Sequence, residues 1–187
     1  MKKLLFAVAL VLGAVTVSAQ EVGNIWVGGS AGIWSYKVGD GDRETNYNIV
    51  PEVGYVLSED LGLGVKLGYA KGTFNFAGEE FGDVKVFTIN PFARYSFLKG
   101  DVGSLFVDGG VRYSNVNEDK EGVDDNANVF EVGFRPGVAI NVTEKISVLG
   151  HFGFLGYQNI KQGDAKADAF GLDLDMTQFT VGVNIFF

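Results

Sequence analysis

The feature that most constrains this chain is a two-residue alternation of apolar and other side chains over stretches of about ten residues. The stretch TQFTVGVNIFF (177–187) places Phe179, Val181, Val183, Ile185 and Phe187 on one face. Such alternation predicts a β-strand with one apolar face. Eight segments carry it: roughly 23–36, 45–57, 61–71, 85–98, 104–115, 128–142, 145–157 and 174–187. None of the eight shows a sustained 3.6-residue period, so the sequence predicts an all-β fold.

The connections between these segments alternate in length and polarity. Three are short (58–60, 99–103 and 143–144), and four are long and polar (37–44, 72–84, 116–127 and 158–173). The long ones include GDGDRE (39–44) and NEDKEGVDD (117–125). Short turns on one side and long charged loops on the other are typical of an up-and-down antiparallel meander. The spacing therefore predicts eight antiparallel strands in chain order.

Three prolines interrupt this pattern at equivalent places. Pro51, Pro91 and Pro136 align when NIVPEVGYVL (48–57), TINPFARYSF (88–97) and GFRPGVAINV (133–142) are superimposed. A proline inside a paired strand loses a ladder hydrogen bond and marks an edge or a bulge. We expect a bulge or a locally opened ladder at one common depth.

The two faces of the strands differ in chemistry. One face is apolar, with aromatic residues at the ends of each run and aliphatic residues between them, as in Tyr47, Ile49, Pro51, Val53, Tyr55 and Leu57. This is typical of strands that cross a bilayer, where aromatic rings lie at the headgroup level. The other face is small or charged. A soluble sandwich, the alternative, would bury the apolar face and expose the charges to water.

In a closed barrel the charged face points inward, and eight strands leave an interior just wide enough for side chains. Glycines on this face would make room for long Arg and Lys side chains. Buried charges persist when they are paired and hydrogen-bonded. The sequence thus predicts a structural ion-pair network, not a catalytic site, formed by Glu52, Lys66, Arg94, Asp108, Arg112, Glu131 and Arg135.

The N-terminus predicts an export signal at residues 1–19, followed by one domain at residues 20–187. Lys2 and Lys3 precede an apolar run without charge, and Val17-Ser18-Ala19 offers small residues for cleavage. Removal of the signal would leave 13 basic and 23 acidic residues, a net charge of −10. That acidity argues against a nucleic-acid partner. The chain has no cysteine, so it forms no disulfides.

Other candidate sites have simpler interpretations. His151, the single histidine, falls on the inward face without a neighbouring serine nucleophile, so we expect a hydrogen-bonded interior residue. The acidic runs at 39–44 and 118–125 lack the alternating ligand spacing of a calcium loop. GGSAG (28–32) lacks the Lys-Ser/Thr of a phosphate-binding loop. We therefore predict no metal, no cofactor and no enzymatic activity.

A resemblance to a known family supports the membrane interpretation. Residues 51–70 (PEVGYVLSEDLGLGVKLGYA) and 91–97 (PFARYSF) resemble the outer membrane protein beta-barrel domain family, the small OmpX/OmpA-type barrels of Gram-negative bacteria. The likeness covers essentially the whole chain after residue 19. Thr180, Gly182, Ile185 and Phe187 match the C-terminal signal of outer-membrane proteins. The resemblance implies recognition by the barrel-assembly machinery, contact with outer-membrane lipid and a location in the bacterial outer membrane.

The expected function is structural or surface-interacting. A filled interior and four long acidic loops favour a non-enzymatic barrel that contacts surface ligands through those loops, because binding residues lie disproportionately on loops held by a rigid scaffold. Two alternatives remain at this point. One is a narrow pore for ions or small solutes. The other is a secreted lipocalin-like barrel, which would line its interior with apolar groups and carry a C-terminal helix.

Overall fold

The computed structural model describes residues 21–37, 43–76, 79–100, 102–120, 123–174 and 180–187. The predicted signal at 1–19 lies outside the described residues. The described part forms β1 (Ile25–Lys37), β2 (Arg43–Val56), β3 (Leu61–Phe76), β4 (Glu79–Gly100), β5 (Gly103–Lys120), β6 (Val123–Asn141), β7 (Ile146–His151), β8 (Phe154–Gln162), β9 (Ala165–Asp173) and β10 (Thr180–Phe186). It contains no helix of the length and apolarity needed to span a membrane.

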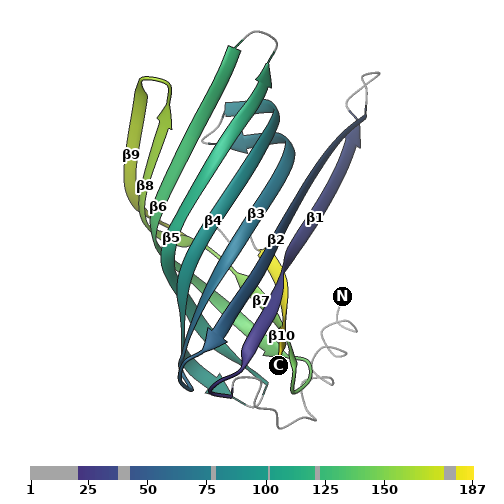
Figure 1. The fold of residues 1–187 in the computed structure, drawn as a ribbon, viewed down its shortest axis with the longest axis vertical. Helices are drawn as coiled ribbons and strands as arrows, with labels where there is room; N and C mark the ends of the chain where they lie inside the picture. The colour runs from purple at the N-terminus through teal and green to yellow at the C-terminus, as the bar shows by residue number, and fades with distance from the viewer. Residues whose placement is uncertain (1–20, 38–42, 77–78, 101, 121–122, 175–179) are drawn as a thin grey trace.

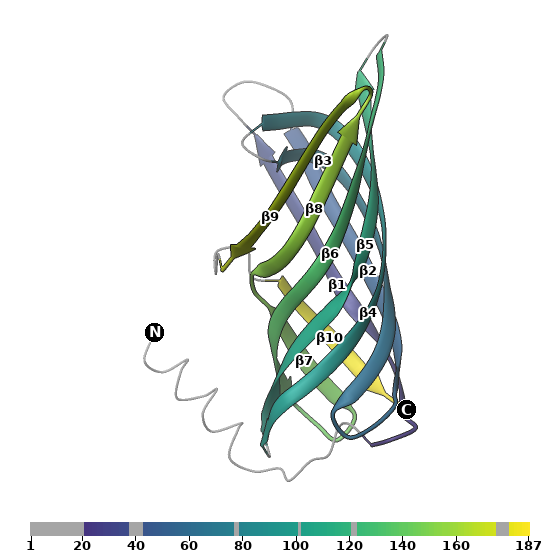
Figure 2. The ribbon, with the colours of Figure 1, turned by 90° about the vertical axis from the view of Figure 1, so that its left-hand side faces the viewer.

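The sheet closes on itself. Neighbouring strands pair antiparallel from β1 to β6, and β10 pairs with both β1 and β7. β7 and β8 both pair with β6, so they are two halves of one barrel strand. β10 and β9 pair with those two halves and complete the next strand. Among the described residues the result is an eight-stranded up-and-down barrel, as the alternation predicts (Figures 1 and 2).

The connections differ from the prediction at one end of the barrel. Residues 158–173, predicted as a loop, form most of the β8–β9 hairpin, and β3, β4, β5 and β6 extend far into the other predicted loops. The β5–β6 register is unbroken from Gly103↔Ile140 to Lys120↔Val123. Beyond the membrane both faces of a strand are polar, so the alternation disappears while the pairing continues. We call this end the hairpin end, and the opposite end, with the short connections, the turn end.

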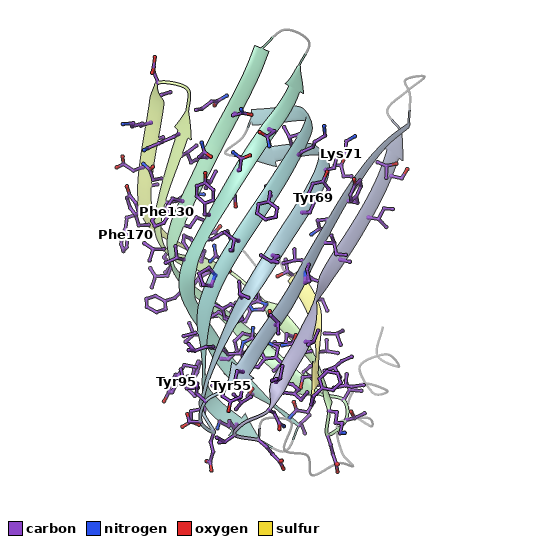
Figure 3. All side chains as sticks on the ribbon, in the orientation of Figure 1. Tyr55, Tyr69, Lys71, Tyr95, Phe130 and Phe170 are labelled. Atoms are coloured by element: carbon purple, nitrogen blue, oxygen red, sulfur yellow. The ribbon has the colours of Figure 1, made fainter. Side chains whose placement is uncertain are left out.

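The apolar face points outward, as predicted. Many of its side chains are exposed, including Ile49, Val53, Leu63, Phe87 and Phe134. Figure 3 shows Tyr69, Lys71, Phe130 and Phe170 toward the hairpin end and Tyr55 and Tyr95 toward the turn end. Two aromatic levels separated by aliphatic residues are typical of a barrel in a bilayer. An outward apolar face and a charged interior rule out both the sandwich and the lipocalin-like alternative.

The prolines open the ladder as expected, in two different ways. The β2–β3 pairing lapses beside Pro51, and the β4–β5 pairing lapses beside Pro91; each resumes in the same register. Opposite Pro136 the neighbouring strand carries one extra residue, where β7 ends and β8 begins, and Gly153 there has φ +71°. The expected opened ladder is thus confirmed at two prolines, and at the third a bulge lies in the partner strand.

Candidate functional site: the barrel interior

Asp108 on β5 is the centre of a charged group inside the barrel. Its Oδ1 accepts a hydrogen bond from Arg94 Nε at 2.7 Å, and its Oδ2 accepts one from Arg94 Nη2 at 2.8 Å. Lys66 Nζ donates to Oδ2 at 2.9 Å, and His151 Nε2 lies 2.8 Å from the same oxygen. Asp108 is 4% exposed. A carboxylate at that depth needs these partners to remain charged.

Glu52 on β2 continues the group toward the turn end. Its Oε1 accepts hydrogen bonds from Trp26 Nε1 at 2.7 Å and from Asn184 Nδ2 at 3.0 Å. Arg94 Nη1 lies 3.3 Å from the same oxygen, and Lys66 Nζ lies 3.5 Å from Oε2. Together with Asp108 and His151, these side chains come from β1, β2, β3, β4, β5, β7 and β10. The group therefore links strands around nearly the whole circumference.

A second charged group lies nearer the hairpin end. Arg112 Nη1 is 3.2 Å and Arg135 Nη2 is 3.1 Å from Glu131 Oε2. The Arg135 guanidinium also lies over the Phe154 ring at 4.4 Å. Arg112 Nε is buried without a hydrogen-bond partner in the described structure. The seven predicted interior charges thus form two groups, one with Glu52 and Asp108 and one with Glu131.

Aromatic side chains fill the space between these charges, and sequence reasoning missed them. Trp26, Phe92 and Phe186 form a buried cluster with Val56, while Phe106 packs with Ala139 and Leu149. The Arg94 guanidinium carbon lies 4.5 Å from the Phe106 ring centroid and 5.2 Å from that of Phe92. Cations over aromatic faces are stabilised by the ring quadrupole. The sequence pattern could have identified these rings as interior, because each one lies at a position of the alternation whose side chain points inward.

Interior glycines leave space for these aromatic rings rather than for the charged side chains. A Cβ at Gly54 would lie 2.0 Å from the Trp26 ring, and one at Gly64 would lie 2.7 Å from the Phe92 ring. The expectation that glycines make room for Arg and Lys is therefore wrong at these two positions. Near the turn end, a cavity of about 10 Å³ beside Trp26, Arg94 and Phe186 has room for roughly one water molecule. The rings close this end of the interior.

His151 lies where the sequence places it, on the inward face and hydrogen-bonded. The atoms within hydrogen-bond distance of its Nε2 are Asp108 Oδ2 and Lys66 Nζ, the latter at 3.3 Å. The shorter contact favours a proton on Nε2 that is donated to the carboxylate. Within the described residues no group of three or more His, Asp or Glu side chains is arranged to hold a metal ion.

The C-terminal residues belong to the strand that closes the barrel. Ile185 and Phe187 are exposed on the outer face, while Gly182 approaches the backbone of Gly29. The backbone N–H and C=O of Phe187 bond to Ile25 at 2.9 and 3.2 Å. Thr180 begins β10 and pairs with β7 opposite His151. Recognition of these residues by the assembly machinery stays a prediction.

The family model of the outer membrane protein beta-barrel domain matches residues 4–187. Neisserial surface protein A is a similar solved structure, with 18% identity, coverage of 88% of this chain and 96% of that chain, and a TM-score of 0.53. The N-terminal β-barrel domain of Pseudomonas aeruginosa OprF has 13% identity, 89% and 98% coverage, and a TM-score of 0.46. The attachment invasion locus protein Ail of Yersinia pestis has 15% identity, 89% and 100% coverage, and a TM-score of 0.45.

The comparison with curated proteins gives no match. The similarity to the neisserial protein, at 18% identity, shows a shared fold. The family match spans nearly all of the sequence and agrees with a closed barrel that exposes its apolar face. The chain is therefore a protein of the bacterial outer membrane and belongs to the outer membrane protein beta-barrel domain family.

Proposed function

We propose that this protein is a non-enzymatic outer-membrane barrel that presents its long hairpins at the cell surface for contact with other surfaces. The observation that carries the proposal is the length of these hairpins. β5 continues for seven residues beyond Tyr113, about 23 Å along the strand, and remains paired with β6 throughout. The paired strands carry the hairpin as far as Lys120 and Val123, well beyond the aromatic level, which suits a contact surface.

The charge of the hairpins indicates the kind of partner. The stretch NEDKEGVDD (117–125) carries five acidic residues and one lysine, and GDGDRE (39–44) carries three acids and one arginine. Complementary charge steers association and selects among partners. The partner is therefore expected to present a cationic surface.

Shortening the β5–β6 hairpin is expected to reduce adherence several-fold. Residues 117–126 would be replaced by Asn-Gly, because Val116 and Ala127 are directly opposite and this dipeptide favours a two-residue hairpin turn. Adherence of a Gram-negative strain displaying the chain would be measured on a surface coated with a basic protein, with equal surface amounts of each variant. A matched variant keeps the length but exchanges the five acids for amides. Unchanged adherence in both variants contradicts the proposal.

The interior argues against the pore alternative, because its charged and aromatic groups are tightly packed. Glu52, Arg94 and Asp108 are buried among Trp26 and Phe106. Reconstituted into a planar bilayer, the refolded barrel is expected to give no discrete conductance steps. Insertion would be checked independently by the altered gel mobility of the unheated protein. Reproducible steps would favour the pore and would show that water passes the two charged groups.

A further inference from the structure

A groove lies on the outer face of the barrel, where the aromatic level of the hairpin end gives way to polar side chains. Its volume is about 530 Å³, within the range of about 300–1,000 Å³ that small-ligand sites occupy. Three strands line it, through Tyr113 on β5, Asn128 and Phe130 on β6, and Tyr157, Asn159 and Lys161 on β8. The three rings are 44%, 41% and 36% exposed, so a ligand can pack against them.

Above the aromatic level the outward positions of β5 and β6 are asparagines. Asn115 is directly opposite Asn128, and Asn117 is directly opposite Asn126. Tyr113, one outward position below Asn115, is the last aromatic residue of β5 before the hairpin tip. A surface of amide groups belongs in water, because amides without partners are costly in hydrocarbon. The upper part of the groove therefore lies outside the apolar layer of the membrane.

Hydrogen bonds hold the two amides of the groove in fixed orientations. Asn128 Oδ1 accepts hydrogen bonds from Tyr113 Oη at 2.7 Å and from Asn115 Nδ2 at 3.0 Å. Asn159 Nδ2 donates to the carbonyl oxygen of Ala167 at 3.4 Å. In the described part of the chain, Asn128 Nδ2 and Asn159 Oδ1 have no hydrogen-bond partner. The groove therefore offers a ligand one N–H donor group and one carbonyl acceptor.

The charges beside the groove cancel. Lys161 is directly opposite Lys166 on β9, and Asp168 follows Lys166 at the next outward position. Asp164 lies in the turn between β8 and β9, so two lysines face two aspartates. The acids of the β5–β6 tip begin two outward pairs beyond Asn128. A balanced surface attracts neither an anion nor a cation, and charge complementarity therefore favours an uncharged ligand.

We propose that this groove binds a sugar ring of an uncharged oligosaccharide at the cell surface. The apolar C–H face of the ring packs on Phe130 and Tyr157. Two neighbouring hydroxyl groups meet the amides, one accepting a hydrogen bond from Asn128 Nδ2 and the other donating to Asn159 Oδ1. Sugars combine both features, because each hydroxyl can donate and accept while the ring carbons remain apolar. A lipid acyl chain on this surface would leave both amide groups without a partner. The sugar is additional to the cationic partner proposed for the hairpin tips, and neither assignment depends on the other.

The test is saturation-transfer difference NMR of the full-length mature barrel in phosphatidylcholine nanodiscs, with empty nanodiscs as the blank. The probes are a panel of free, uncharged di- to tetrasaccharides of hexoses and N-acetylhexosamines. At least one is expected to bind, with saturation concentrated on the C–H protons of one ring face, because those protons contact the aromatic rings. Titration of that probe gives its dissociation constant. Absence of saturation across the whole panel overturns the proposal.

Two variants separate the amide contact from the ring contact. Asn128→Asp keeps an oxygen that accepts from Tyr113 Oη but loses the free N–H group, so affinity is expected to fall about five-fold, the equivalent of one hydrogen bond. Asn126→Asp makes the same chemical change one outward pair further along β6 and should bind as the unchanged protein does. Tyr157→Ala removes a ring and should weaken binding about ten-fold, whereas Tyr55→Ala at the turn end should have no effect. Equal weakening by a variant and its control overturns the assignment to this groove.

Charged and lipid-linked forms of the same probe separate the remaining explanations. The sugar phosphate is expected to bind no more tightly than the neutral sugar, because the lysines and aspartates beside the groove balance. The free sugar is expected to bind without an attached acyl chain. Tighter binding of the phosphate would indicate an anion site at Lys161, and binding only of the acyl-linked sugar would indicate ordinary lipid contact. Either result overturns the proposal.

Discussion

Replacing Asp108 by alanine is expected to lower the free energy of unfolding of the barrel by about 3–5 kcal/mol. The side chain is buried, and its two oxygens accept hydrogen bonds from Arg94 and from Lys66. Without it, two cations in the interior would share the single carboxylate of Glu52, which is itself more than 3 Å from both. A buried charge left without its partner is far more costly than a missing surface contact. Urea titration of the barrel refolded into phosphatidylcholine vesicles, followed by tryptophan fluorescence, measures the change.

A matched control exists at the surface of the same protein. Asp60, in the β2–β3 turn, forms an ion pair with Lys99, and their side chains are 54% and 37% exposed. Asp60→Ala is expected to cost less than about 1 kcal/mol, because an exposed pair is screened by water and salt. Asp108→Asn, which keeps the shape and loses the charge, should fall between the two. Equal effects of Asp60→Ala and Asp108→Ala would show that the interior network does not stabilise the fold.

Much of the interior network follows from strand register alone. Glu52 is directly opposite Lys66, Arg94 opposite Asp108, and Arg112 opposite Glu131. Each of these acid–base pairs joins neighbouring strands, so the alternation and the connection lengths together contain the information. The alternation alone identifies the seven residues as interior without assigning these partners. A count of residues back from the turns would have supplied Glu52–Lys66 and Arg112–Glu131. It would have missed Arg94–Asp108 by one residue, because the β4–β5 register shifts between Ser96 and Leu98.

Contacts across the barrel could not be predicted in the same way. Lys66 on β3 and His151 on β7 both contact the Asp108 carboxylate, each from a strand two places away from β5, one on either side of it. These contacts depend on how far the strands stagger when the sheet closes, which no local pattern records. The hairpin lengths were missed for a related reason. The alternation of apolar and polar side chains appears only where the two faces of a strand have different surroundings. Beyond the membrane water surrounds both faces, so the alternation ends although the strand continues.

Removing the Trp26 side chain is expected to lower the free energy of unfolding by about 3–5 kcal/mol. The residue is 2% exposed, packs at ring-centroid distances of 6.5 Å from Phe92 and 6.3 Å from Phe186, and donates its N–H to Glu52. Trp26→Ala would leave a cavity and an interior carboxylate with one donor fewer. Trp26→Phe keeps most of the packing and loses the hydrogen bond, so it should cost about 1–3 kcal/mol. Circular dichroism during urea unfolding serves as the probe, since these variants change the fluorophore.

The close approach of Gly54 to this ring gives a sharper test than either substitution alone. With Trp26 in place, Gly54→Ala brings a Cβ to 2.0 Å from the indole, which is expected to cost about 1–3 kcal/mol or to prevent refolding. With Trp26→Ala, the same change fills part of the cavity, so its cost should fall to near zero or change sign. Such non-additivity is the mark of two side chains competing for one space. Gly171→Ala, where a Cβ meets nothing within 4 Å, controls for the loss of glycine itself. Additive effects of Gly54→Ala and Trp26→Ala would mean that the Trp26 ring does not occupy the space above Gly54. The aromatic rings would then not close the interior at the turn end, and the expectation that the barrel gives no conductance steps would lose its basis.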